Sequence, residues 1–245
     1  MTDPRVLFLH GLESDPTSPV GKAADLRASF THVCAPELHT GKTELHRRNS
    51  VARCLLRLPA LRAAIMTAAT SILSAVFAGL PLKLAALGVA LPLAAVAACH
   101  KWLIAASVEA SVAASFAVAV AALKDFRPAV VVGSSWGGGL AQLLVQQGLY
   151  DGPVLFLAPA GRRVAKAMPQ RSKLTQELSA ALPSSCVGVV LHGTRDSIVP
   201  MVDSKILTAQ SPRCVVRTCN DIHALNKVLH REALAALVRE VAALR

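Results

Sequence analysis

Short runs of apolar, often β-branched residues alternate along this chain with longer stretches in which apolar residues recur at helical spacing. Runs that are apolar throughout are typical of strands in a parallel sheet that helices cover on both faces. The alternation therefore predicts an α/β fold. Six strands are expected, over residues 5–10, 31–38, 128–134, 152–160, 185–194 and 213–220. A last apolar periodicity predicts a helix over residues 224–245.

A long, almost uncharged stretch interrupts this alternation. Only three charged residues occur between Ala63 and Leu123, and this stretch raises the mean hydropathy of the whole chain to +0.47. We expect residues 107–123 to form the helix that leads into the third strand. Residues 57–106 then form an apolar helical insertion within a single domain that spans residues 1–245.

The insertion has two interpretations. Ala63 to Leu82 is about 20 residues, which is enough to cross a bilayer, and the shorter segment from Leu84 to Cys99 would return, with Trp102 at the interface. Because strands on both sides of the insertion join one sheet, the number of crossings must be even. A group of arginines before the first apolar segment would keep the rest of the domain in the cytoplasm: Arg47, Arg48, Arg53, Arg57 and Arg62. The alternative is an alanine-rich hairpin that caps the active site in water.

The overall composition excludes some classes of function. The formal net charge is +11, but aromatic residues make up only 4% and no recognition helix or stacking motif accompanies the charge, so we expect no nucleic-acid partner. The six cysteines show no CxxC pair and no zinc-type spacing, which predicts reduced thiols in a reducing compartment. The first residues lack the basic and apolar regions of a secretory signal. A cytoplasmic protein is expected, which the hairpin would anchor to a membrane.

The most informative motif is Gly-Ser-Ser-Trp-Gly at residues 133–137, which fits the pattern G-x-S-x-G with Ser135 at its centre. It follows a run of valines and precedes a helical stretch. In this context the serine lies in a tight strand-to-helix turn that exposes its hydroxyl at the edge of the sheet. The two glycines allow neighbouring backbones to approach. Ser135 is therefore the candidate nucleophile, whereas a serine that only caps the helix is the structural alternative.

A serine nucleophile needs a general base that follows it in the chain order of this architecture. His192 ends a strand before any suitable acid, and His230 is expected in the middle of the last helix. His223 lies in the loop between the last strand and the last helix. We therefore assign His223 as the base.

The base in turn needs a carboxylate to orient it. Asp196 lies just beyond the fifth strand, in a turn that Pro200 closes. Asp203 is a weaker alternative in the next helix, and Asp221 is too close to His223 along the chain. Asp196 is the predicted acid.

Two backbone N–H groups should form an oxyanion hole. One is that of Trp136, directly after the nucleophile, and the other is that of Leu12, in the loop after the first strand. His10 precedes Leu12 in the sequence His-Gly-Leu. A buried histidine that organises this loop is favoured over a histidine that takes part in catalysis.

These segments, FLHGLESDPTSPVGKAADL, VVGSSWGG, HGTRDSIVP and NDIH, resemble the α/β-hydrolase superfamily and, more narrowly, its small YqiA-like esterases. The resemblance covers about three quarters of the chain. It implies a parallel sheet of about six strands and a hydrolase of esters, thioesters or related acyl compounds, with Ser135, Asp196 and His223 as the triad and no metal or cofactor. The first two strands of larger members are missing. The apolar insertion has no counterpart in the minimal fold.

The leading hypothesis is thus a serine hydrolase that acts on a small-molecule ester or thioester, with an apolar acyl chain that the insertion would contact. A second hypothesis is a non-catalytic, membrane-associated scaffold on a hydrolase fold. A third is another reaction class, such as a lyase or peroxidase, because a fold does not determine a reaction.

Overall fold

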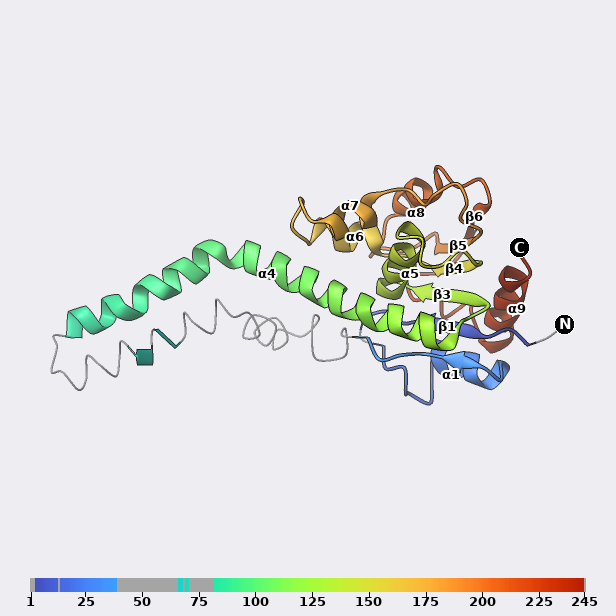
Figure 1. Cartoon of the computed structure of the whole chain (residues 1–245), viewed down its shortest axis with the longest axis horizontal. Helices are drawn as coiled ribbons and strands as arrows, with labels where there is room; N and C mark the ends of the chain where they lie inside the picture. Colours follow the sequence, from blue (N-terminus) through green and yellow to red (C-terminus); the bar gives the residue numbers. More distant parts are fainter. Residues whose placement is uncertain (1–2, 13, 39–65, 68, 71–81, 245) are drawn as a thin grey trace.

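The computed structural model describes residues 3–12, 14–38, 66–67, 69–70 and 82–244. Its centre is a six-stranded, all-parallel sheet in the order β2-β1-β3-β4-β5-β6 (Figure 1). All six predicted strands are present: β1 (Val6–Leu9), β2 (Val33–Cys34), β3 (Val130–Ser134), β4 (Val154–Leu157), β5 (Gly188–Gly193) and β6 (Cys214–Cys219). The predicted fold class is confirmed.

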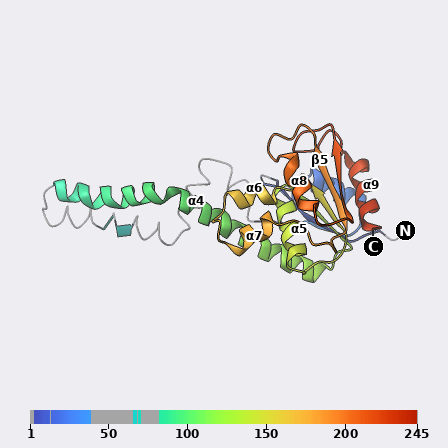
Figure 2. The same cartoon turned by 90° about the horizontal axis from the view of Figure 1, so that it is seen from above.

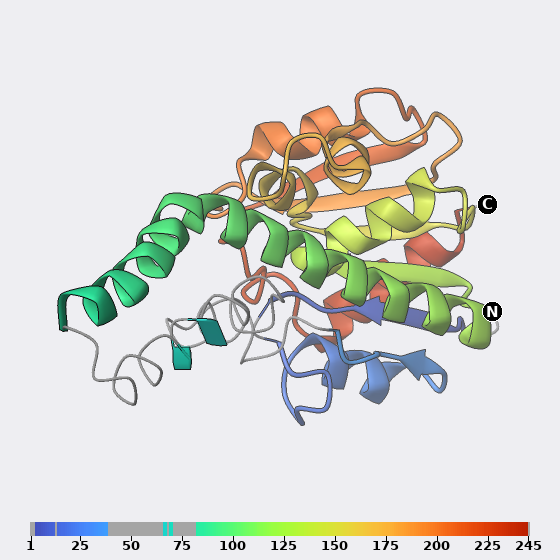
Figure 3. The ribbon, with the colours of Figure 1, turned by 60° about the vertical axis from the view of Figure 1, so that its left-hand side comes forward.

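Helices cover both faces of the sheet (Figure 3). Alternate residues of each strand point to opposite faces. In β1, Val6 and Phe8 pack toward one apolar cluster, and Leu7 and Leu9 toward the other. The first cluster lies under α1 (Lys22–Ser29) and α9 (Arg231–Ala242). The second lies under helices of the opposite face: α4 (Leu82–Phe126), α5 (Trp136–Gln146), α6 (Gly161–Lys166), α7 (Lys173–Ser179) and α8 (Met201–Thr208).

Helix α4 is far longer than the strands of the sheet. Its 45 residues correspond to a length of about 68 Å, whereas a strand of six residues spans about 20 Å. Its last residue is fixed at the amino edge of the sheet, where the Arg5 guanidinium lies over the Phe126 ring and its Nε donates to the Phe126 carbonyl at 2.9 Å. The first half of α4 therefore extends well beyond the carboxyl edge (Figures 1 and 2).

No helix end marks the boundary predicted at residues 106–107. The helix expected over residues 107–123 is present, but it continues without a break from the apolar segment before it. The physical reason is that residues 93–126 contain neither glycine nor proline and are rich in alanine, the best helix former. Nothing in this stretch ends a helix, and the polar residues around Trp102, which is 60% exposed, lie within α4.

One stretch of the described residues, Ile104–Phe126, is long and apolar enough to cross a membrane by length and composition. It is also the part of α4 that packs on the sheet, where Val112 and Ala119 are buried. Most of the first predicted crossing, Ala63–Leu82, and the arginine cluster before it lie outside the described residues. The membrane hairpin and the cap both stay predictions, as does the division into a domain and an insertion.

The C-terminal helix starts later than the periodicity predicted. Helix α9 begins at Arg231, and His230 is its N-cap residue rather than a residue in its middle. The residues between β6 and α9 form turns, with Leu225 at a positive φ of 55°. Leu225 is nevertheless buried in the same cluster as the apolar face of α9. The periodicity therefore predicted correctly that this residue is buried, but incorrectly that it is helical.

Candidate active site

Ser135 lies in the turn between β3 and α5, at φ 51° and ψ −110°. A positive φ in a residue other than glycine is strained and is maintained only when the surroundings impose it. The two flanking glycines show how. A Cβ on Gly137 would lie 1.9 Å from the Leu9 carbonyl oxygen, and a Cβ on Gly133 would lie 2.6 Å from the Gly137 oxygen. The glycines of the motif are therefore required by close packing of β1, β3 and α5.

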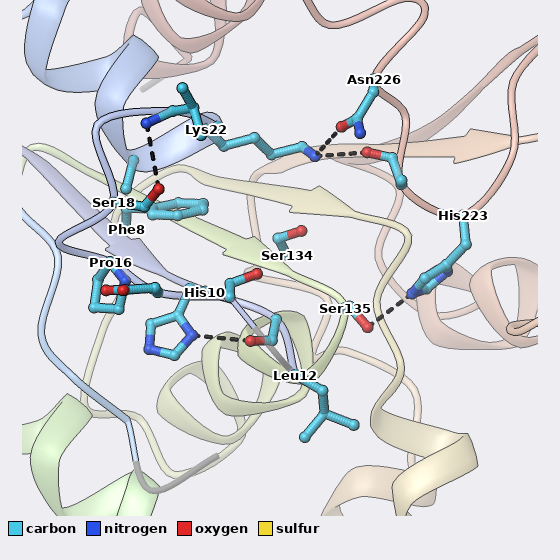
Figure 4. A pocket seen from close by; sticks show the side chains of 17 residues that line it. Phe8, His10, Leu12, Pro16, Ser18, Lys22, Ser134, Ser135, His223 and Asn226 are labelled. Carbon is cyan, nitrogen blue, oxygen red and sulfur yellow. Dashed lines mark hydrogen bonds between the residues drawn. The ribbon is translucent and has the colours of Figure 1, made fainter. Parts of the chain in front are cut away.

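The structure brings Ser135, Asp196 and His223 together at the carboxyl edge of the sheet. The Ser135 Oγ lies 2.8 Å from His223 Nε2, and His223 Nδ1 lies 2.7 Å from Asp196 Oδ2. Because a carboxylate can only accept, the Nδ1–H group of His223 donates to Asp196, and the Nε2 of the neutral ring has a lone pair that accepts a hydrogen bond from the serine hydroxyl. Figure 4 shows His223 pointing toward Ser135 from the segment that precedes α9.

Asp196 is held in place through its second oxygen. The Asp196 side chain is 1% exposed, and its Oδ1 accepts hydrogen bonds from the backbone N–H groups of Ile198 and Val199, both at 2.8 Å. His192, which is fully buried, approaches its Oδ2 at 3.4 Å. The carboxylate therefore has fixed donors on both oxygens, with Oδ2 directed at His223.

The rejected candidates have other partners. His192 donates from Nε2 to the Val199 carbonyl at 3.0 Å, and its Nδ1 accepts from the Ser204 hydroxyl at 2.7 Å. The alternative acid, Asp203, is buried on α8 and lies 3.4 Å from Arg162 Nε. Neither side chain is hydrogen-bonded to Ser135 or His223.

The histidine segment, residues 220–230, is anchored by Asp221. Its buried carboxylate accepts hydrogen bonds from the N–H groups of Ile222 at 2.7 Å, Lys227 at 2.8 Å and Val228 at 2.9 Å. Burial alone would raise the pKa of Asp221, but these three donors outweigh burial and lower the pKa below its ordinary value. Asp221 is thus a structural anion that closes the turn around His223.

The predicted oxyanion donors lie on either side of the nucleophile. Within the described residues, the backbone N–H groups of Leu12 and Trp136 donate no hydrogen bond. A Cβ on Gly11 would lie 3.3 Å from the Ser135 Cβ, so the loop that carries Leu12 runs directly beside the serine.

His10 organises this loop, as the sequence predicted. The ring is fully buried, its Nδ1 donates to the Gly11 carbonyl at 2.9 Å, and its Nε2 accepts from the Leu38 N–H at 3.1 Å. Desolvation lowers the pKa of His10, which favours the neutral ring that this pair of hydrogen bonds requires.

A cavity of about 400 Å³ opens beside the nucleophile (Figure 4). The loop between β1 and α1 forms most of its wall, together with the first residues of α1, and Ser134, Ser135 and His223 complete it. Within the described part of the chain, no group of three or more His, Cys, Asp or Glu side chains is placed to hold a metal ion.

Comparisons were made with known proteins. No protein-family model matches the chain, and no curated protein matches it. Solved structures do match. The structure of the metagenome-derived lipolytic enzymes LipS and LipT is similar over 97% of this chain and 95% of its own, with a TM-score of 0.56 and 14% identity. TT1662 from Thermus thermophilus is similar over 99% of this chain and 91% of its own (TM-score 0.54, 15% identity). Est1E from Butyrivibrio proteoclasticus, with bound ferulic acid, is similar over 97% and 87% (TM-score 0.52, 12% identity).

The chain has the α/β-hydrolase fold. Identities of 12–15% make this a likeness of fold, and the α/β-hydrolase topology accounts for the meeting of three distant loops at one edge.

The sequence did not reveal the roles of three residues around this α/β-hydrolase site. Asp221 was weighed only as an acid for His223 and His192 only as a base, and Lys22, which donates to the Ala224 carbonyl at 2.6 Å, was given no role. All three act through contacts with segments distant in sequence or with backbone groups, which no local pattern encodes. The one available signal was the position of each residue beside a predicted site loop.

Proposed function

We propose that this chain is a serine hydrolase that cleaves a carboxylic ester or thioester through an acyl-enzyme. The observation that carries the proposal is the continuous hydrogen-bonded array from Ser135 through His223 to a buried Asp196, with distances of 2.8 and 2.7 Å. The strained conformation of Ser135 supports it, because such strain clusters at functional sites.

In the first half of the reaction, His223 Nε2 takes the proton of Ser135 Oγ as that oxygen bonds to the substrate carbonyl carbon. Asp196 stabilises the imidazolium that forms and keeps it in the productive orientation. The negative charge on the carbonyl oxygen is accepted by the N–H groups of Leu12 and Trp136. The bond to the leaving group then breaks, and His223 returns its proton to that group.

In the second half, water replaces the leaving group. His223 takes a proton from water, whose oxygen attacks the acyl carbon, and the bond to Ser135 Oγ breaks with return of the proton. Each half of the reaction begins with neutral imidazole, because only an unprotonated Nε2 can take a proton from the serine or from water.

The substrate in this proposal has an apolar acyl chain. Leu12 beside the nucleophile packs against the cluster under α4, and α4 extends beyond the edge of the sheet that carries Ser135. An apolar chain leaving the site on this side would lie along an apolar helix, whether the insertion caps the site or enters a membrane.

The test of the nucleophile is labelling with a fluorophosphonate, together with hydrolysis of a short water-soluble ester. Ser135→Ala should abolish both while the melting temperature stays close to that of the unmodified protein. Ser134→Ala, the neighbouring serine of the same motif, is the matched control and should retain both. Loss of labelling in Ser134→Ala alone would refute the assignment.

The test of the acyl chain is replacement of residues 63–99 by a short Gly/Ser linker. Cleavage of short esters should persist, and cleavage of long-chain or membrane-presented esters should fall much further. Equal loss on short and long esters would refute the proposed role of the insertion. Release of the full-length chain from membranes by carbonate would refute the membrane hairpin.

A further inference from the structure

The cavity beside Ser135 is lined partly by apolar side chains, among them Phe8 and Pro16, and partly by polar ones. Among the polar ones, Ser18 and Ser134 carry hydroxyl groups, Asn226 an amide and Lys22 an ammonium group (Figure 4). An apolar acyl chain gains little from the polar part of the wall, because its groups would lose water without a new partner. This side of the site therefore suits a different part of the substrate from the one that faces α4.

Lys22 is the first residue of α1, and its side chain extends along this wall. Its Nζ donates to the Ala224 carbonyl oxygen at 2.6 Å and to Asn226 Oδ1 at 3.2 Å (Figure 4). An ammonium group has three N–H donors, so one remains after these two bonds. Both acceptors are neutral, and they belong to the first three residues after His223.

The charge of Lys22 is incompletely balanced. Desolvation lowers the pKa of the ammonium group, and the fields of Asp221 and Asp25 act in the opposite direction without restoring the ordinary value. Across the described ranges of the chain, no carboxylate lies within 4.0 Å of Lys22 Nζ. A partly desolvated cation with neutral partners favours an anionic ligand.

Among the described residues that line the cavity, the carboxylate is that of Asp15. Its Oδ1 accepts hydrogen bonds from the Thr17 N–H at 2.9 Å and from the Thr17 hydroxyl at 2.6 Å. Asp15 is thus engaged within its own turn, and no ion pair joins it to Lys22 in the described residues. An anion that enters the cavity would meet Lys22 as its opposite charge.

We propose that this cavity binds a carboxylate carried by the substrate, with Lys22 as the residue that selects it. The proposal deepens the proposed hydrolase function and rests on it. The carboxylate accepts a hydrogen bond from the remaining N–H group of Lys22, and the hydroxyl groups of Ser14 and Ser18 provide further donors. The physiological substrate is then an ester or thioester that has an anionic group on the side facing α1.

The experiment compares two matched pairs of esters, because the carboxylate can lie on either side of the scissile bond. The first pair is 4-nitrophenyl hemiglutarate and 4-nitrophenyl pentanoate, which differ by a carboxylate on the acyl group. The second is 4-carboxyphenyl pentanoate and its methyl ester, which differ by a carboxylate on the leaving group. After correction for spontaneous hydrolysis, the unmodified protein should prefer the charged ester in one pair by about 10-fold or more in kcat/KM. Preference for the neutral ester in both pairs would overturn the proposal without any variant.

Lys22→Met keeps the unbranched side chain, shorter by one atom, and removes its charge. It should lower kcat/KM for the preferred charged ester by about 10- to 100-fold more than for its neutral partner. Lys22→Arg should retain part of the preference. Lys205→Met, at an exposed position on α8, is the control and should change neither rate.

The alternative role of Lys22 is to position His223 through Ala224. In that case Lys22→Met would slow charged and neutral esters equally in both pairs, and this result would overturn the proposal. Failure of the hydrolase function gives a different result, because Ser135→Ala would then leave hydrolysis of all four esters unchanged.

Discussion

The turn that carries Ser135 and the segment that carries His223 deliver adjacent side chains to one site, but different forces hold them. The Ser135 turn is fixed by sterics, since Gly133 and Gly137 leave no room for a Cβ between β1, β3 and α5. The histidine segment is fixed by polar groups: Asp221 binds its backbone N–H groups, and Lys22 binds the Ala224 carbonyl.

The difference predicts different responses to substitution. The turn at Ser135 cannot adjust, because its contacts join backbone atoms of buried elements. Substitution of its glycines should therefore reduce the stability of the whole sheet. The histidine segment can loosen locally while the sheet remains intact. Removal of one of its hydrogen bonds should therefore reduce activity more than stability.

The largest effect is expected at Asp196. Asp196→Asn removes the charge that orients His223 and stabilises its cation, and kcat should fall by about 10⁴-fold. Asp203→Asn, which changes the rejected acid on the same side of the sheet, should leave kcat within about threefold of the unmodified value. Steady-state kinetics on one short ester measure both variants. A benign Asp196→Asn with a damaging Asp203→Asn would reverse the assignment of the acid.

Substitutions in the turn that carries Ser135 should change the stability of the protein. Gly137→Ala places a Cβ 1.9 Å from the Leu9 carbonyl oxygen, so a buried backbone must move, and the free energy of unfolding should fall by about 3 kcal/mol or more. Gly148→Ala is the control: Gly148 has a φ of 65° but no atom within 4 Å of its Cβ, so the cost should be about 1 kcal/mol. Denaturant titration followed by circular dichroism compares them. Equal costs at the two glycines would show that packing does not fix the turn.

The histidine segment should respond in activity and in pH dependence. Asp221→Asn weakens the hydrogen bonds to Ile222, Lys227 and Val228, which should lower kcat several-fold and the melting temperature by a few degrees. The folded-state pKa of Asp221 is below its unfolded value, so the stability it contributes is complete above the unfolded pKa of about 4 and is lost as pH falls through the folded pKa.

Thermal melts of Asp221→Asn and the unmodified protein at several pH values test this direction of the pH dependence of stability. The difference between their melting temperatures should be constant near neutral pH and shrink below about pH 4. Asp125→Asn, at an exposed position near the end of α4, should show no such trend. A difference that grew toward acid pH would contradict the anchoring role of Asp221.

The same contrast explains which parts of the molecule could be predicted from the sequence. The six strands, their parallel arrangement and the Ser135 turn follow from local patterns of apolar residues and glycines. Asp196 and His223 could be predicted because, in this fold, the acid and the histidine follow the nucleophile in a fixed chain order, each in a loop after a strand. These features depend on neighbours in the chain or on topology.

The remaining features depend on contacts that span the chain. The bond from Lys22 to Ala224 joins residues 202 positions apart, and no periodicity reports it. The start of α9 was misplaced because Asp221 binds the N–H groups of Lys227 and Val228, which holds that stretch in turns. The length of α4 was missed because the insertion was predicted to end at residue 106, just after Trp102 at a membrane interface, although a helix continues when no glycine or proline stops it.

The most direct test of the account is to locate the acyl group on the enzyme during turnover. The protein is mixed with excess 4-nitrophenyl ester, quenched in acid within the first turnover, digested and mapped by mass spectrometry. We expect one acyl group per chain, on the peptide that contains Ser135, and no acylation in Ser135→Ala. Acylation of Ser134 or another residue, or rapid turnover by Ser135→Ala, would contradict the assignment of Ser135 as the nucleophile.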